Sequence, residues 1–348
     1  MKNKVLIITH TQDNPCVEKV SEAIARKGGQ VVRLNVDRYP IDYRITTLFN
    51  KGKWEILLAD NDGAVHNLTT EFLSLWNRRI YNLGSCLEEV LEKKYLNSSI
   101  GESNATLIGM LSHLEHELFT LNSYSENKRS GIKEKQLRIA DQCGLTIPRT
   151  CISNDFEQVK AFVKSCPNGV IAKMQHAFSI YEEGVESVVF TNEIGEADLE
   201  DLEAQLRLCP MKFQEKIEKK LELRITIIGK RVFAAALDSQ LKKDGEIDWR
   251  KVGQESIGDW KSCSIPDDLK ANLLRFHEVC NLNYGASDVI LTPEGEYIFL
   301  ESNPGGEFFW LDEEANYAIS DEIASLLVKE SIAVPHVPTN ELEASGLV

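Results

Sequence analysis

Hydrophobic and polar positions at the start of the chain alternate between a strand pattern and a helix pattern. The apolar run VLIITH at 5–10 is followed by a helix-like repeat from Cys16 to Lys27 and by a second apolar run at 31–36. Short apolar runs are typical of buried strands, and apolar residues three or four positions apart are typical of one helix face. The glycines after Lys27 favour a helix end there. The pattern therefore predicts a β-α-β unit that opens an α/β domain.

The pattern changes twice further along the chain. A long helical zone is predicted from Ser85 to Leu121, and the polar segment 122–135 separates it from another helix that ends at Gly144. Short strands dominate the remainder, and the last two form a hairpin around Pro293-Glu294-Gly295. We therefore expect an N-terminal domain with a helical extension, a central domain, a C-terminal domain and an extended or disordered tail, at 1–122, 123–208, 209–330 and 331–348 respectively.

Composition limits the class of protein. With 348 residues, of which 43% are hydrophobic and 27% charged, the chain is long enough for two or three globular domains. It contains no apolar run of about 18 residues and no signal-peptide pattern, so we expect a cytoplasmic protein without a membrane partner. A net charge of -15 argues against a nucleic-acid partner. The eight cysteines show no zinc-site spacing, and we interpret them as reduced thiols.

The final hairpin carries oxygen ligands at the end of a buried strand. Asp288 lies on its first strand, and Glu301 and Asn303 lie at the end of its second strand. Antiparallel pairing can bring Asp288 opposite Glu301, and the period of two places Glu301 and Asn303 on one face. Two carboxylates and an amide suit Mg²⁺, which takes its other ligands from water and phosphate. The alternative is a surface hairpin with solvated carboxylates.

Four basic residues make a phosphate ligand plausible. Lys173 interrupts an apolar strand, where an unpaired charge is unfavourable, and Lys133 opens a helix, whose first peptide groups favour anions. Arg224 and Arg250 lie in LELRITIIG and DWRK. Each could instead lie on an exposed face or in an ion pair. The chain has no P-loop, no GxGxxG turn and no GxSxG elbow, so neither the usual nucleotide loops nor a serine nucleophile is predicted.

These residues resemble the ATP-grasp superfamily from about Lys128 onward. The segments that carry the resemblance are KEKQLRIADQCGLTIPRT, IAKMQ, FQEKIEKKLELRITIIG, DWRK and NYGASDVILTPEGEYIFLESNPGGEFFW. Together with LNVDRYP, LWNRR and CPMKFQ, they are similar to the ligases that mature microviridin and related graspetides. The resemblance implies an α/β (α+β) ATP-grasp fold, in which a Rossmann-like pre-ATP-grasp domain precedes the central and C-terminal ATP-grasp domains.

The resemblance also implies a role for individual residues. Lys133 is favoured over Lys128 and Lys135 because it lies 15 positions before Pro148, the spacing expected for the family. The implied ATP-binding residues are Lys133, Lys173, the adenine hinge Gln214, Glu215, Lys216 and Ile217, and Glu222 near the ribose. The implied catalytic residues near the transferred phosphate are Arg224, Arg250 and Lys173, and the implied Mg²⁺ ligands are Asp288, Glu301 and Asn303.

The resemblance implies an ATP-dependent carboxylate ligase that phosphorylates Asp or Glu side chains of a ribosomally made precursor peptide. Ester crosslinks with Ser or Thr, or amide crosslinks with Lys, would then close macrocycles. ATP and Mg²⁺ are the implied cofactors, and the implied partners are a precursor with leader and acidic core and a second subunit in a homodimer. Arg78 and Arg79 could position acidic peptide residues, or they could be surface arginines at a strand end.

Two other functions are compatible with the same motifs. One is a ligase of the glutamate-ligase type, which adds an amino acid to a protein or peptide. The other is a regulator that binds nucleotide and peptide without turnover. The sequence does not distinguish ester from amide crosslinks, because the attacking group belongs to the peptide.

Overall fold

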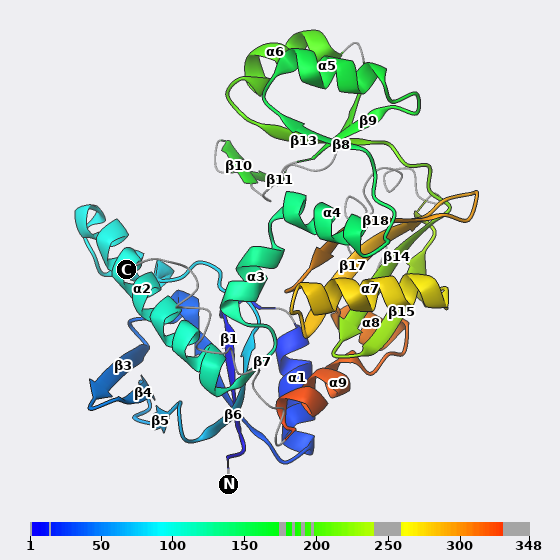
Figure 1. The fold of residues 1–348 in the computed structure, drawn as a ribbon. Coiled ribbons are helices and arrows are strands. Elements are labelled where there is room, and N and C mark those ends of the chain that lie inside the picture. The colour runs from blue at the N-terminus through cyan, green and yellow to red at the C-terminus, as the bar shows by residue number, and fades with distance from the viewer. Residues whose placement is uncertain are drawn as a thin grey trace.

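The structure, a computed structural model, describes residues 2–13, 15–173, 179–182, 185–188, 192–195, 198–239 and 259–329. Its N-terminal part is a parallel sheet with helices on both faces (Figure 1). The strand order is β2 (Gln30–Asn35), β1 (Lys4–Thr9), β6 (Phe72–Asn77) and β7 (Phe119–Thr120). Helices α1 (Pro15–Arg26) and α9 (Ile319–Leu327) pack on one face, and α2 (Lys93–Glu117) packs on the other. The predicted β-α-β unit is confirmed.

Strand β1 explains why both faces of this sheet are covered. Val5 and Ile7 pack in the cluster that contains α1 and α9, whereas Leu6 and Ile8 pack in the cluster that contains α2. Successive strand residues point to opposite faces, so an uninterrupted apolar run requires cover on both sides. Helix α9 comes from the end of the described chain, and it therefore joins the C-terminal part to the N-terminal sheet.

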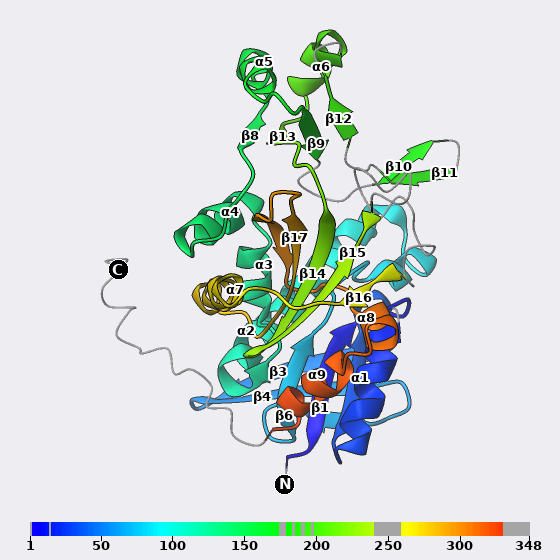
Figure 2. The ribbon, with the colours of Figure 1, turned by 90° about the vertical axis from the view of Figure 1, so that its right-hand side faces the viewer.

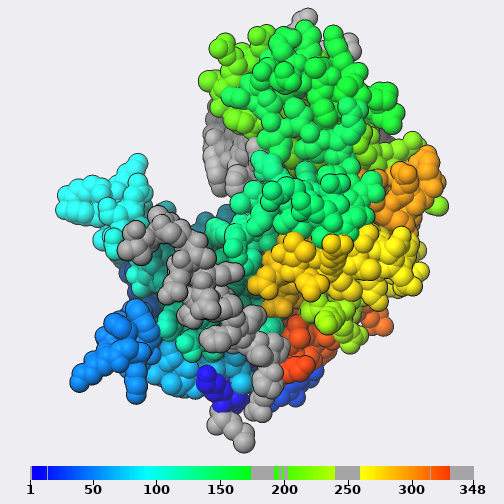
Figure 3. Space-filling model, viewed as in Figure 1, coloured from blue at the N-terminus to red at the C-terminus, as the bar shows by residue number. Residues whose placement is uncertain are grey.

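A second, antiparallel sheet projects from the N-terminal part. It consists of β3 (Tyr43–Asn50), β4 (Lys53–Asp60) and β5 (Val65–Asn67). The space-filling view shows this sheet, in blue, reaching out to one side (Figure 3). Strand β3 was not predicted, because most of its residues are exposed and its sequence lacks a regular apolar face.

The central part is an antiparallel sheet covered by two helices at one end of the molecule (Figure 2). Its strand order is β12 (Asn192–Ile194), β9 (Val170–Lys173), β13 (Met211–Glu215) and β8 (Thr150–Ser153). Helices α5 (Phe156–Lys164) and α6 (Leu199–Leu206) pack on one face through Phe213 and Val170. A separate hairpin consists of β10 (Ser179–Glu182) and β11 (Val185–Val188). The other face of the sheet carries Lys173, Lys212 and Gln214, which alternate with the core residues Ala172 and Phe213.

The C-terminal part is a five-stranded antiparallel sheet between the other two parts (Figure 2). Its strand order is β16 (Lys261–Ser262), β15 (Arg231–Leu237), β14 (Leu221–Ile228), β17 (Tyr284–Leu291) and β18 (Tyr297–Asn303). Helices α7 (Asp267–Val279) and α4 (Lys133–Gln142) cover one face, with Ile225 and Phe299 in their shared core. Helix α8 (Phe309–Glu314) follows β18 after a short turn.

The structure divides the helical zone predicted at 85–121 into two helices, because the 3-10 helix η2 (Ser85–Glu89) precedes α2. A second 3-10 helix, η1 (Val36–Arg38), follows β2. The polar segment 122–135 contains an unpredicted helix, α3 (Tyr124–Ser130), which begins where the Ser123 hydroxyl accepts a hydrogen bond from the Glu126 amide. All eight cysteines are free. None of the described helices combines the length and hydropathy needed to cross a membrane. The domain limits stay predictions, and the proposed tail lies outside the described residues.

Candidate active site

A β-bulge in β18 places the predicted metal ligands on one face of the five-stranded sheet. Leu300 has no partner in the ladder with β17, so the residues that follow it are shifted by one position. Val289 on β17 packs in the core beside α7, whereas Asp288 points to the opposite face. The shift pairs Asp288 with Glu301 and turns Glu301 and Asn303 to that same face. The predicted facing of Asp288 and Glu301 is confirmed.

Asn303 contacts both carboxylates, and Asp288 also contacts Arg224. The Arg224 guanidinium donates through Nη1 to Asp288 Oδ1 at 2.8 Å. The Asn303 amide donates to Glu301 Oε1 at 3.2 Å and to Asp288 Oδ2 at 3.4 Å. No group of three His, Cys, Asp or Glu side chains with metal-site geometry occurs within the described ranges. The set formed by Asp288, Glu301 and Asn303 is of a different kind, because it combines two carboxylates with an amide. Such an all-oxygen donor set fits Mg²⁺.

Glu301 also binds the first predicted phosphate lysine. Lys133, the first residue of α4, donates to Glu301 Oε2 at 2.7 Å. Burial alone would raise the pKa of Glu301, but the positive charges of Lys133, Lys212 and Lys173 hold it well below its usual range. Glu301 is therefore ionised at neutral pH, as a metal ligand requires.

The second predicted phosphate lysine has a cross-strand neighbour that the sequence did not reveal. Lys173 is the last residue of β9, and it pairs directly with Lys212 on β13. Lys212 is 3% exposed. Burial, and then the charge of Lys173, lower the pKa of Lys212 to about 8. The only sequence signal for Lys212 was a lysine within the apolar strand pattern of CPMKFQ.

The predicted adenine hinge begins at the end of β13. Gln214 is buried and donates to the Thr150 hydroxyl at 3.0 Å, while its Oε1 accepts no hydrogen bond from the described chain. The Glu215 carboxylate accepts a hydrogen bond from the backbone amide of Arg149 at 2.8 Å, and Lys216 pairs with Glu193 at 2.7 Å.

Strand β13 ends at Glu215, so Lys216 and Ile217 lie after the strand. Glu222, two residues before Arg224 on β14, accepts from Lys219 at 2.7 Å. Arg250 lies outside the described residues.

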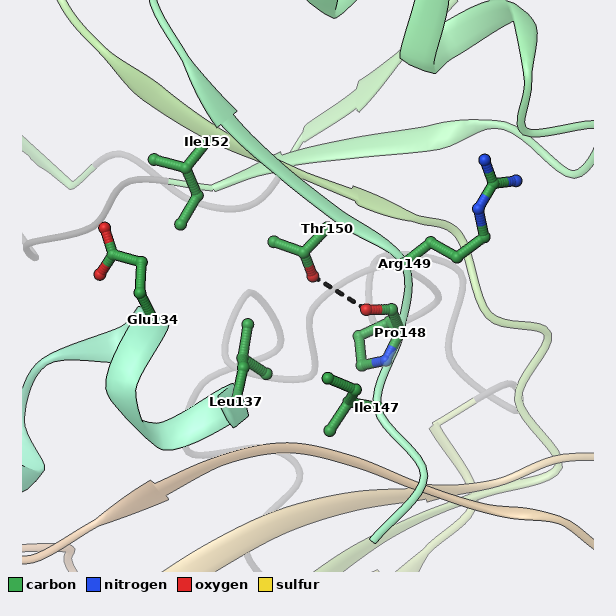
Figure 4. A pocket seen from close by; sticks show the side chains of 7 residues that line it. All are labelled: Glu134, Leu137, Ile147, Pro148, Arg149, Thr150 and Ile152. Carbon is green, nitrogen blue, oxygen red and sulfur yellow. Dashed lines mark hydrogen bonds between the residues drawn. The ribbon is translucent and has the colours of Figure 1, made fainter. Parts of the chain in front are cut away.

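A pocket of about 460 Å³ opens between α4 and β8, on the side of the central sheet that carries the lysines (Figure 4). Leu137 and Ile147 line one side of the pocket, and Thr150 and Ile152 of β8 line the other. Thr150 and Ile152 pair with Gln214 and Lys212. The pocket is therefore an extension of the space beside the hinge.

A buried ion network holds the turn that follows the metal ligands. Arg78 donates to Gly305 O and to Glu307 Oε2, both at 2.7 Å, and Arg79 also pairs with Glu307. Gly306 lies so close to Arg224 that an added Cβ would be 2.7 Å from its Nη2. Arg224 Nη2 donates to the Glu307 carbonyl at 3.3 Å. The network thus joins the end of β6 to the site, through contacts more than 200 positions apart.

The two arginines predicted to position a peptide differ in exposure. The Arg78 side chain is 1% exposed and binds Asp13 and Glu307 within the chain. Arg79 keeps 37% of its side chain exposed. The sequence indicated an arginine pair but gave no sign of its partner, because Glu307 follows the Pro-Gly-Gly turn in a distant segment.

Comparisons with known proteins agree with this arrangement. The family model described as the MvdD pre-ATP grasp domain matches residues 4–128. A RiPP-associated ATP-grasp ligase of Chryseobacterium gregarium, solved with ADP and a leader and core peptide, is 44% identical. The alignment covers 93% of this chain and 96% of that chain, with a TM-score of 0.87. No match was found among curated proteins.

Two macrocyclases of Microcystis aeruginosa are also similar. MdnC, solved with its precursor peptide MdnA, is 35% identical over 93% of this chain and 99% of that chain, with a TM-score of 0.83. MdnB is 31% identical over 94% and 99% of the two chains, with a TM-score of 0.77. The fold is thus that of an ATP-grasp ligase with a pre-ATP-grasp domain. The chain belongs to the RiPP-associated ATP-grasp ligases, which act in the maturation of ribosomally made peptides.

Proposed function

We propose that this protein uses ATP and Mg²⁺ to crosslink a ribosomally made precursor peptide through its Asp or Glu side chains. One observation carries the proposal: Glu301 lies between Lys133, which contacts it, and Asn303 and Asp288, which complete an oxygen ligand set. Cationic groups for phosphate and hard ligands for Mg²⁺ therefore meet in one place. Membership in the ligase family supports the same function.

In the proposed reaction, the γ-phosphoryl group of ATP is transferred to a peptide carboxylate, which gives an acyl phosphate and ADP. A Ser or Thr hydroxyl, or a Lys amine, then attacks the acyl carbon, the phosphate leaves, and the nucleophile loses its proton. Mg²⁺ would neutralise phosphate oxygens when it is held by Asp288, Glu301 and Asn303. The chain's own part is positioning and charge stabilisation by Lys133, Lys173 and Arg224, and no covalent enzyme nucleophile is needed.

Each remaining predicted site residue has a place in this proposal. The hinge residues Gln214, Glu215, Lys216 and Ile217 would contact the adenine, and Glu222 the ribose. Arg250 would assist Arg224 at the transferred phosphate. Arg79, whose partly exposed side chain also pairs with Glu307, would attract an acidic core residue of the peptide.

The precursor is proposed to bind through both a leader and a core segment. The ligase of Chryseobacterium gregarium was solved with both segments, and MdnC with its precursor peptide. The decisive experiment incubates the protein with ATP, Mg²⁺ and a candidate precursor and measures the peptide mass. Each crosslink should lower the mass by one water. A mass that rises by an amino acid would instead indicate a glutamate-ligase type of reaction.

We further propose a homodimer and a cytoplasmic location. An apolar patch on the β3–β4 sheet supports the dimer: Phe49 and Trp54 are 61% and 47% exposed, and their ring centroids are 4.7 Å apart. Light scattering after size exclusion should give twice the chain mass for the wild type and the single mass for a variant with Phe49→Ser and Trp54→Ser. The eight free cysteines suit a reducing compartment.

A further inference from the structure

Lys212 is buried, and the family resemblance implies no role for it. Lys212 is 3% exposed, and its side chain makes no hydrogen bond or ion pair to any residue that the structure describes. Phe213, its neighbour in β13, points into the core beneath α5 and α6, so Lys212 points to the opposite face, toward the site. A buried ammonium group without a partner is unfavourable for folding. Such a group at this position therefore indicates a ligand.

The charges around Lys212 specify an anion. Lys173 is directly opposite it on β9, and like charges in a direct cross-strand pair destabilise a sheet. The charged groups nearest Lys212 also include Lys133, Glu301 and Glu134. Lys133, Lys173 and Lys212 thus lie near two carboxylates, of which Glu301 is already bound by Lys133. A polyanion bound beside Lys212 would contact this group of lysines.

The strand register indicates which part of a nucleotide would reach Lys212. Gln214 pairs with Ile171, and two residues along the same strands Lys212 pairs with Lys173. Positions two apart on a strand share a face and are separated by about 7 Å. A nucleotide with its base beside Gln214 can therefore extend its phosphates over the rung formed by the two lysines.

We propose that Lys212 binds the polyphosphate of the nucleotide, as a third phosphate-binding lysine beside Lys133 and Lys173. The inference rests on the proposed nucleotide-dependent function. The inference places Lys212 beside the phosphates and not beside the base. Removing the lysine should therefore weaken the binding of a ligand more when the ligand carries more phosphates. A purely structural lysine would not discriminate among such ligands.

The test compares binding of ADP, AMP and adenosine, with Mg²⁺, by titration calorimetry of the full chain. Lys212→Met should weaken ADP binding roughly 10- to 100-fold, which is the value of one charge-assisted hydrogen bond, and should leave adenosine binding unchanged. Lys212→Arg keeps the positive charge and should bind ADP more tightly than Lys212→Met. The matched control is Lys270→Met, which removes the same charge from an exposed position on α7.

The outcomes separate this inference from the proposed function. Equal ADP affinity of Lys212→Met and the wild type would overturn the inference and leave the function standing. Equal weakening of ADP and adenosine would also overturn it, because the effect would then act through the fold or the hinge. If wild type itself does not bind ADP, the proposed function is wrong. Should Lys212→Met not fold, Lys212→Gln replaces it under the same criteria.

Discussion

The two sheets that meet at the site each bury a cation, and they do so in opposite ways. Arg224 on the five-stranded sheet is bound by Asp288 and by the Glu307 carbonyl. Burial would lower the pKa of Arg224, but the charge and hydrogen bond of Asp288, together with the charges of Tyr284 and Glu301, outweigh burial and raise it. Lys212 on the central sheet has no such carboxylate, and burial lowers its pKa to about 8.

The two sheets therefore differ in how the charge of the buried cation is compensated. On the five-stranded sheet, Asp288 holds Arg224, and Lys133 of α4 holds Glu301, so these side chains keep their geometry without a ligand. Lys212 on the central sheet contacts no carboxylate within the described residues, so an anion should stabilise this sheet more than it stabilises the other sheet. The following predictions test the two halves of this contrast, from the largest expected effect to the smallest.

Glu301→Gln should reduce crosslinking at least about a thousand-fold, because it removes the carboxylate shared by the metal site and Lys133. The measurement is loss of water from the precursor by mass spectrometry, together with ADP release. Glu294→Gln is the matched control, because it makes the same change at the exposed turn of the same hairpin. Wild-type turnover in Glu301→Gln would exclude Glu301 as a metal ligand.

Arg224→Met should slow crosslinking by about 100-fold or more, since it removes a charge placed to stabilise the transferred phosphate and leaves Asp288 unpaired. The rate of ADP formation under saturating ATP measures this effect. Arg231→Met, on the neighbouring strand with an exposed side chain, should react at the wild-type rate. Equal rates for the two variants would remove Arg224 from the mechanism.

Glu307→Gln should lower the free energy of unfolding by about 3 kcal/mol, because the buried Arg78 would lose its closest carboxylate. Chemical denaturation at neutral pH measures this change. Glu313→Gln breaks an exposed pair with Lys19 and should change stability by less than about 1 kcal/mol. A similar small effect for Glu307→Gln would mean that the network does not hold the turn.

Lys212→Met should raise the free energy of unfolding near pH 7 by about 2 to 3 kcal/mol. The lysine pKa falls from 10.5 to about 8 on folding, so the unfolded chain binds more protons between these values. The destabilisation of the fold by charged Lys212 is therefore greatest below pH 8, and it decreases as the pH rises toward 10.5. Denaturation at pH 7 and pH 9.5 should show the stability difference shrinking at the higher pH. A constant difference would show that the lysine does not titrate in this range.

Much of the site could be predicted because its signals are local. The hairpin turn and the period of two placed Asp288, Glu301 and Asn303 together, and the helix start placed Lys133. Even there, the facing of Asp288 and Glu301 depends on the bulge at Leu300, which the sequence did not indicate.

The parts that could not be predicted depend on contacts between distant segments. Lys212 faces Lys173 only because β13 pairs with β9, and CPMKFQ alone gives no pairing. Arg78 is buried among partners from distant segments, and one of them, Glu307, is 229 positions away. The exposed strand β3 has too little apolar periodicity to be recognised. In each case the tertiary partner determines the role, and no local pattern encodes that partner.

The unpaired Leu300 determines which residues at the end of β18 face the site. It lies between the turn and the ligands, so it sets which alternate residues of Glu301-Ser302-Asn303 face the site. Deleting one residue there would keep every functional side chain in the sequence and yet present Ser302 in place of the two ligands. In this hairpin, chain length between two points is as much a determinant of function as residue identity.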